Sequence, residues 1–173
     1  QLDFASNFVL PETDFDVVVN NAGINISDVP THKVSDHAWT LTLQVNLTAP
    51  FLIIRQCLPS MIRKRRGRII NISSIYGLRA VEGNFPYTVS KHGLAGLTKT
   101  IAKEYAPYGI TCNEICPGPI DSDMMRKIAA KAVMNTRKSL NSYLKEVREE
   151  IPAKRMAKPE EIAALAVFLA SSQ

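Results

Sequence analysis

Short apolar stretches that end in small or polar residues alternate along this chain with longer segments of helical periodicity. The apolar stretches are residues 16–20, 68–74 and 110–116, and the helical segments between them are 35–66 and 87–108. Near-continuous apolar runs are typical of parallel strands buried on both faces. Strands that alternate with helices predict right-handed crossovers and a parallel sheet, so the expected fold class is α/β.

Two long helices are expected between the strands. Over residues 35–66 apolar side chains recur at three- and four-residue spacing, Ser35 is a suitable N-cap, and Gly67 is expected to end this long or broken helix. The second helix is expected over 87–108 and is closed by Gly109. Small residues on one side of it predict close packing there: Ser90, Gly93 and Gly96.

The C-terminal part of the chain is expected to be helical. A basic helical stretch is predicted over residues 121–150, and an apolar helix is predicted from Pro159 to Ala170. A proline in the first turn followed by Glu160 and Glu161 suits a helix N-terminus.

The loops after the three strands are the expected place for a ligand, because parallel α/β sheets bind ligands beyond the carboxyl ends of their strands. Those loops follow Val19, Ser74 and Cys116. Ser74 therefore lies at the expected ligand site. Its hydroxyl could donate a hydrogen bond to a substrate carbonyl oxygen that gains negative charge. Taken alone, it also fits an ordinary serine at the end of a strand.

Tyr87 and Lys91 stand at positions i and i+4 of a helix start, which places their Cβ atoms about 6 Å apart on one face. A free tyrosine has a pKa of about 10, and a nearby cation is expected to lower that pKa, so that Tyr87 can exchange a proton with a substrate oxygen. The same spacing also arises by chance on amphipathic helices. Of the five tyrosines, only Tyr87 has a lysine at this offset.

The order and spacing of five motifs resemble the short-chain dehydrogenase/reductase family. The motifs are Asn20-Asn21-Ala22-Gly23, Val45-Asn46-Leu47-Thr48, Ile72-Ser73-Ser74, Tyr87-Thr88-Val89-Ser90-Lys91 and Pro117-Gly118-Pro119-Ile120. Residues 155–163 and 168–172 also resemble the late helix of the family. The resemblance implies a Rossmann-like, doubly wound parallel sheet in three αβα layers, incomplete in this chain.

The resemblance also implies roles for individual residues. Tyr87 is the expected acid/base and is also expected to contact the cofactor. Lys91 is expected to lower the pKa of Tyr87 and to hold the nicotinamide ribose. Ser74 is expected to orient the substrate carbonyl, and Asn46 to position a water for proton relay. Residues expected to stabilise the central sheet and border the adenosine side are Asn20, Ala22 and Gly23. Residues expected to meet the nicotinamide are Pro117, Gly118, Ile120 and Ser122.

The sequence departs from the family pattern at both ends. No G-x-x-x-G-x-G or G-x-G-x-x-G run occurs in it, so the glycine-rich phosphate turn that holds a pyrophosphate at a helix N-terminus is missing. The final strand of the family is missing as well, and we expect the chain to be a fragment.

We expect a single domain over 1–173, with residues 121–155 as a segment over the substrate site. The cofactor is expected to be NADP or NAD, with a slight preference for NADP.

The leading functional hypothesis is a reductase of 3-oxoacyl thioesters of acyl-carrier protein or coenzyme A, which would belong to fatty acid biosynthesis. A basic 121–155 segment and the basic cluster 63–68 would attract an acidic carrier protein by long-range electrostatics. A rival hypothesis is a dehydrogenase of small hydroxy acids, sugars or polyols. A hypothesis of another class is a truncated, non-catalytic module for oligomerisation or regulation, which the missing glycine-rich turn favours.

Composition restricts the other possibilities. The three cysteines lack the spacing of a disulfide framework or, with the three histidines, of a metal site, so we expect free thiols and no metal. No nucleic-acid-binding motif accompanies the net charge of +5. Apolar runs are too short to cross a bilayer, so no membrane association and a cytoplasmic location are expected.

The family resemblance implies a homo-oligomer, a dimer or tetramer, formed through the two long helices.

Overall fold

The computed structural model describes residues 8–11, 13–134 and 136–171. These residues form two compact units, one made of the described residues up to Cys116 together with 168–171, and the other of Pro117–Val167. Each unit is described by itself. The expectation of a single domain over 1–173, with a segment over the substrate site at 121–155, stays a prediction.

Three parallel strands form the sheet of the first unit. They lie in the order β1 (Val17–Asn20), β2 (Gly67–Ile72) and β3 (Ile110–Ile115). Val18 pairs with Ile69, and Ile69 pairs with Cys112. The α/β class and the parallel sheet are therefore confirmed, and no strand end lies more than two residues from the predicted one.

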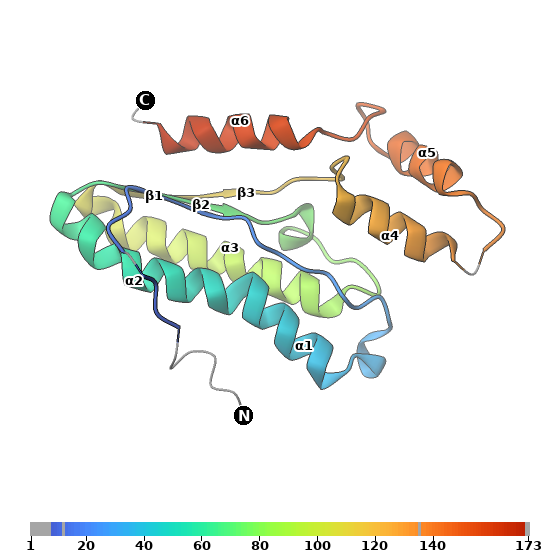
Figure 1. The fold of residues 1–173 in the computed structure, drawn as a ribbon, viewed down its shortest axis with the longest axis horizontal. Helices are drawn as coiled ribbons and strands as arrows, with labels where there is room; N and C mark the ends of the chain where they lie inside the picture. Colours follow the sequence, from blue (N-terminus) through green and yellow to red (C-terminus); the bar gives the residue numbers. More distant parts are fainter. Residues whose placement is uncertain (1–7, 12, 135, 172–173) are drawn as a thin grey trace. The chain divides into compact units, whose positions relative to one another are not determined.

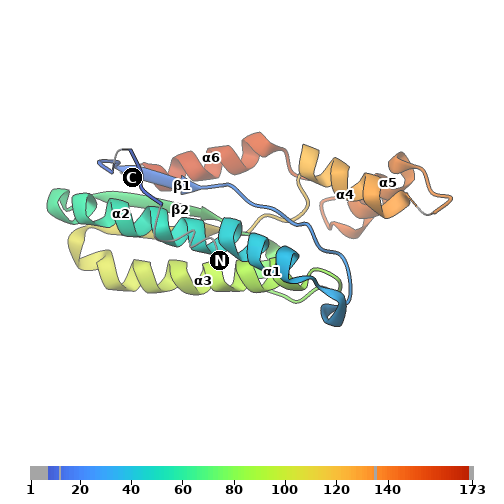
Figure 2. The ribbon, with the colours of Figure 1, turned by 60° about the horizontal axis from the view of Figure 1, so that its bottom comes forward.

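A long helical run and a second helix lie side by side on one face of this sheet (Figures 1 and 2). The run consists of α1 (Asp36–Leu43), the π-helical turn η2 (Gln44–Thr48) and α2 (Ala49–Lys64), and the second helix is α3 (Phe85–Tyr105), followed by the 3-10 turn η4 (Ala106–Tyr108). Ser35 caps the run as predicted, because its Oγ accepts a hydrogen bond from the Ala38 N–H at 3.2 Å. The core between helices and sheet is apolar: Val18, Ile54, Cys57, Leu58, Met61, Ile69, Ile110 and Cys112.

The prediction that Gly67 ends the first helix is wrong. The helix ends at Lys64 with Arg65 in the left-handed region (φ 50°), and Gly67 is the first residue of β2. A Cβ at Gly67 would lie 2.6 Å from the Met61 Sδ, so the glycine is required by close packing rather than by a turn. Gly109 does close the second helical segment, in the left-handed region (φ 71°).

Close packing along α3 is confirmed at two of the three small residues. Ser90 is fully buried, and a Cβ at Gly93 would lie 2.7 Å from a methyl carbon of Leu47. Gly96 is exposed and a Cβ there would have no neighbour within 4 Å, so the prediction is wrong at this position. The side of α3 that approaches the π turn therefore ends before Gly96.

The second unit contains α4 (Asp123–Val133), α5 (Leu140–Glu150) and most of α6 (Pro159–Ala170). The single basic helix predicted over 121–150 is wrong, because Ser139 begins a new helix: its Oγ accepts a hydrogen bond from the Ser142 N–H at 3.1 Å. The last helix has the predicted limits. A parallel bridge between Ile120 and Ala157 joins the segment before α4 to the segment after α5.

The helical run 36–64 is long and apolar enough, by length and composition, to cross a membrane, with a mean hydropathy of 1.2 over its most apolar window. Within the structure 44% of that window is buried. Leu52, Ile54 and Cys57 of α2 are at most 1% exposed and pack in the core. We therefore interpret the run as a core helix.

Candidate active site

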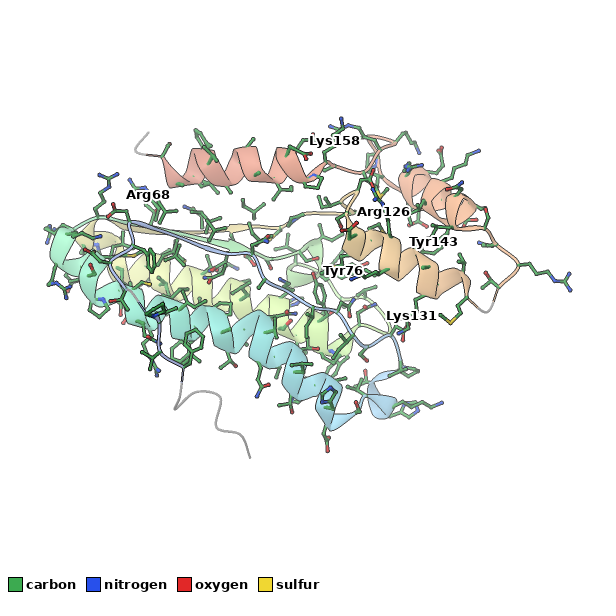
Figure 3. The ribbon with its side chains drawn as sticks, viewed as in Figure 1. Arg68, Tyr76, Arg126, Lys131, Tyr143 and Lys158 are labelled. Atoms are coloured by element: carbon green, nitrogen blue, oxygen red, sulfur yellow. The ribbon has the colours of Figure 1, made fainter. Side chains whose placement is uncertain are left out.

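Ser74 follows β2 at the carboxyl edge of the sheet, as predicted. It begins the 3-10 turn η3 (Ile75–Gly77), and its Oγ accepts a hydrogen bond from the Tyr76 N–H at 3.1 Å. Figure 3 shows Tyr76 beyond the carboxyl end of β2 and Arg68 at the opposite end of that strand. Ser74 is 8% exposed, so its hydroxyl lies in a largely dry environment.

Tyr87 and Lys91 lie in the first turns of α3, which begins with Phe85 and Pro86. The Lys91 Nζ lies 5.5 Å from the centroid of the Tyr87 ring, so the predicted side-by-side arrangement is present. Lys91 is only 3% exposed and donates a hydrogen bond of 2.9 Å to the Ile72 carbonyl. The last residue of β2 thus fixes the position of the ammonium group.

The pKa of Tyr87 is raised, which contradicts the expectation that Lys91 lowers it. Burial raises the pKa of the phenol most, hydrogen bonding with Ser74 opposes this effect, and Tyr76 adds to it. Burial also lowers the pKa of Lys91 to about 8, against the opposing charges of Glu114 and Cys116. The expectation failed because both groups are desolvated and the Lys91 ammonium hydrogen-bonds to the Ile72 carbonyl rather than to the phenol oxygen.

Asn46 lies in the π turn η2 and is 1% exposed. Its Oδ1 accepts a hydrogen bond from the Ile24 N–H (2.8 Å), and its Nδ2 donates to the Ile24 carbonyl (2.9 Å) and to Ser90 Oγ (3.0 Å). Ser90 in turn donates to the Tyr87 carbonyl at 2.7 Å. The amide therefore links the loop after β1 to the helix that carries Tyr87, while its predicted role in holding a water stays a prediction.

Gly23 lies beside both of these groups. A Cβ at Gly23 would lie 3.5 Å from the Lys91 Nζ and 3.6 Å from the Asn46 Oδ1. The structure thus brings Gly23, Asn46 and Lys91 together at the carboxyl edge of the sheet. Ala22 is exposed next to Gly23, where its predicted contact with the adenosine side stays a prediction.

Asn20 is tied to the sheet through a residue that the sequence analysis missed. The Asn20 Nδ2 donates to the Asn71 Oδ1 at 2.7 Å, and the Asn71 Nδ2 donates to the Thr98 Oγ1 at 2.8 Å. All three side chains are buried, so the chain of hydrogen bonds connects β1, β2 and α3 inside the core. The signal available in the sequence was an amide in an otherwise apolar strand, Ile69-Ile70-Asn71-Ile72.

The residues predicted to meet the nicotinamide lie in the second unit. Ile120 forms the bridge with Ala157, and Ser122 caps α4 by accepting a hydrogen bond from the Met125 N–H at 3.4 Å. A Cβ at Gly118 would have no neighbour within 4 Å, and Pro117 is half-buried. Contact of these four residues with a nicotinamide stays a prediction.

Among the residues that the structure describes, no cluster of histidine, cysteine, aspartate and glutamate has metal-site geometry.

Comparison with known proteins identifies the family. A family model described as enoyl-(acyl carrier protein) reductase matches residues 8–173. The chain belongs to the short-chain dehydrogenase/reductase family. Its similarity to solved members of this family is high: it is 32% identical to a variant of actinorhodin polyketide ketoreductase with NADPH, with a TM-score of 0.86, and covers 60% of that protein and 91% of itself. The Rossmann-like fold is therefore confirmed, with three strands of the sheet among the described residues.

Characterised relatives in the short-chain dehydrogenase/reductase family differ in substrate. The chain is 40% identical over 158 residues to acetoacetyl-CoA reductase of Shinella zoogloeoides, and 37% identical over 167 residues to a 3-oxoacyl-[acyl-carrier-protein] reductase of Rickettsia prowazekii. These alignments cover 91% and 96% of the chain but 61% and 64% of the relatives. Levodione reductase is 31% identical with a TM-score of 0.85, over 90% of the chain and 59% of the enzyme.

Proposed function

We propose that this chain carries the catalytic part of an NAD(P)-dependent oxidoreductase that moves a hydride between the cofactor and a carbonyl or secondary alcohol carbon. The observation that carries the proposal is the cluster of Ser74, Tyr87 and Lys91 at the carboxyl edge of the sheet, with Lys91 5.5 Å from the Tyr87 ring. Hydrogen bonding between Ser74 and Tyr87 lowers the pKa of the phenol against the effect of burial. The two hydroxyl groups therefore lie within hydrogen-bonding reach of each other.

In the direction of reduction, Tyr87 donates its phenolic proton to the substrate oxygen, and Ser74 donates a hydrogen bond to the same oxygen. A nicotinamide supplies the hydride when it is bound. The residues around Lys91 fit such a group: the Ile72 carbonyl takes one of three N–H donors of the ammonium, which leaves donors for the hydroxyls of a ribose. Gly23 keeps the space before the Nζ free of a side chain. We favour NADP over NAD.

For the substrate, we propose a 3-oxoacyl thioester of acyl-carrier protein or coenzyme A. The acetoacetyl-CoA and 3-oxoacyl-[acyl-carrier-protein] reductases among the relatives support this class. The basic side chains of the second unit support an anionic partner such as an acidic carrier protein. They lie on α4, on α5 and in the segment between them (Figure 3): Arg126, Lys127, Lys131, Arg137, Lys138, Lys145 and Arg148.

A second candidate is a dehydrogenase of sugars, polyols or hydroxy acids. Aldohexose dehydrogenase of Thermoplasma acidophilum is 36% identical with a TM-score of 0.84, over 91% of the chain and 61% of the enzyme. A non-catalytic module is disfavoured by the intact set of Asn46, Ser74, Tyr87 and Lys91. For the assembly we propose a cytoplasmic homo-oligomer formed through α2 and α3.

The test is a steady-state assay of the full-length protein with NADPH and with NADH, after its mass has been measured. Acetoacetyl-CoA, a 3-oxoacyl acyl-carrier protein and, in the reverse direction, gluconate and xylitol are offered in turn. We expect reduction of the 3-oxoacyl thioesters with the higher kcat/KM. A higher kcat/KM for the sugar acid or polyol would transfer the assignment to the second candidate, and no turnover with bound cofactor would support the non-catalytic module.

A further inference from the structure

Glu114 lies near the carboxyl end of β3, on the face of the sheet that α3 covers. Side chains alternate between the two faces of a strand, and Ile110 and Cys112 of β3 are part of the core beneath the helices. Glu114 follows Cys112 at the same period and therefore faces α3, the helix that carries Lys91. No role in the reaction follows for Glu114 from the family motifs.

The carboxylate of Glu114 belongs to a small buried polar cluster. The Glu114 Oε1 and the Ser73 Oγ are both buried, and neither has a hydrogen-bond partner among the described residues. After the effect of burial, the charge of Glu114 is the largest cause that raises the pKa of Cys116. The carboxylate is half-buried and also hydrogen-bonds with the Cys116 thiol, so water screens its charge only in part and its interaction with a nearby cation is strengthened.

Lys91 approaches the same part of the sheet from α3: its Nζ donates to the Ile72 carbonyl, and Ile72 pairs in register with Ile115, the residue after Glu114. The ionisable groups that act on Lys91 are Tyr87 on α3, Glu114 on β3 and Cys116 after β3. Tyr76 on η3 packs against the Tyr87 ring. From the other elements, β2 offers the Ile72 carbonyl and the loop after β1 offers Gly23. Glu114 is the one carboxylate in this described set, and its charge opposes the effect of burial on the pKa of Lys91.

We propose that Glu114 is a positioning residue whose carboxylate keeps Lys91 in its ammonium form beside Tyr87. The 97% burial of Lys91 favours the neutral amine, and a negative charge on the neighbouring strand offsets this preference. The importance of the ammonium for Tyr87 rests on the proposed function. The electrostatic coupling between Glu114 and Lys91 does not, so it is tested without substrate or cofactor.

The experiment is an NMR titration of the chain with ¹³C-labelled lysine side chains, in which the Cε signal of Lys91 is assigned by its loss in Lys91→Arg. The parent is compared with Glu114→Gln, which removes the charge and keeps the size of the side chain. The matched control is Glu104→Gln, which removes one exposed carboxylate from the far end of α3. Amide spectra of all variants establish that the fold is retained.

We expect the pKa of Lys91 to fall by about half a pH unit or more in Glu114→Gln and to stay unchanged in Glu104→Gln. An equal pKa of Lys91 in the parent and in Glu114→Gln would overturn the proposal, whatever the enzyme's activity. If Glu114→Gln does not fold, Glu114→Val makes the same comparison with a side chain suited to a buried parallel strand. A loss of activity at unchanged pKa would indicate that Glu114 is only structural.

Discussion

The Lys91 ammonium lies over the face of the Tyr87 ring, 5.5 Å from its centroid, and donates its hydrogen bond to the backbone of β2 instead of to the phenol oxygen. The hydrogen bond to β2 therefore holds the Lys91 Nζ at its position over the Tyr87 ring. A cation over an aromatic face is attracted to it, which helps to hold a nearly buried lysine in this position. Both ionisable groups remain desolvated, and their pH dependence follows from that burial.

Lys91→Met is expected to stabilise the chain at pH 7. Burial lowers the pKa of Lys91 from its ordinary value of 10.5 to about 8, which corresponds to a penalty of about 3 kcal/mol below pH 8. Loss of the hydrogen bond to the Ile72 carbonyl costs about 1 kcal/mol, so the free energy of unfolding is expected to rise by about 2 kcal/mol.

The sign of the pH dependence gives a further check on this variant. Between pH 8 and 10.5 the unfolded state binds more protons than the folded state, so the parent gains stability as pH rises. Urea unfolding at pH 7 and at pH 10 should therefore show the advantage of Lys91→Met shrinking. A constant difference would mean that the ammonium is not desolvated.

Tyr87→Phe is expected to lower kcat of the full-length enzyme by about 100- to 10,000-fold, because the ring and its packing remain while the proton donor is lost. Binding of the nicotinamide cofactor, measured by fluorescence titration, should change little. Tyr108→Phe, in η4 after α3, is the control that removes a phenol elsewhere. Comparable losses in both variants would argue against Tyr87 as the proton donor.

Asn71→Ala is expected to destabilise the chain by about 2 kcal/mol, because it leaves the buried amide of Asn20 without its partner. The Thr98 hydroxyl would lose one hydrogen bond and keep the other, to the Leu94 carbonyl. Asn141→Ala, at an exposed position on α5, should stay within about 0.5 kcal/mol of the parent. Chemical denaturation of the three proteins makes the comparison. Similar stabilities would show that the hydrogen bonds of Asn71 are replaceable by water.

Two glycines are expected to respond in opposite directions to alanine. Gly109 has φ 71°, and a Cβ there would lie 2.5 Å from the Arg65 carbonyl oxygen, so Gly109→Ala should cost at least about 2 kcal/mol. Gly96 lies in α3 with open space around it, so Gly96→Ala should stabilise by about 0.5 to 1 kcal/mol. Thermal unfolding measures both, and a gain at Gly109 would contradict the described turn.

Ile101→Glu is expected to weaken the proposed homo-oligomer. Ile101 lines an apolar groove between α2 and α3 with Phe51, Leu58 and Leu97, and a carboxylate there would be desolvated by a second copy. Sedimentation velocity of the parent and the variant measures the effect, with Lys145→Glu on α5 as the control. If the two variants sediment alike, α2 and α3 are not the contact face.

Local patterns were predicted well from the sequence, and long-range side-chain pairs were not. The spacing of Tyr87 and Lys91 within one helix was sufficient to predict their proximity, and the parallel topology was sufficient to predict Ser74 at the same edge. The partners of Asn46 and Asn71 depend on how each helix is rotated about its axis. Residues 44 and 27 positions away in the sequence form those hydrogen bonds, and periodicity does not specify them.

The direction of the Tyr87 pKa was predicted wrongly for a related reason. Spacing indicates which charge lies near a group but not how much water reaches it, and here burial exceeds the other effects. The break of the basic segment at Ser139 was also missed, because serine is compatible both with a helix interior and with an N-cap. The three-dimensional structure decides between those two uses.

The left-handed turn at Arg65 and the left-handed turn at Gly109 touch each other, because the Arg65 guanidinium donates to the Pro107 carbonyl at 2.7 Å and the Arg65 carbonyl faces Gly109. One turn leads into β2 and the other into β3. The backbone conformation of each turn therefore depends on its contact with the other. An insertion or deletion in one of them would displace the other. The lengths of the two connections therefore constrain each other.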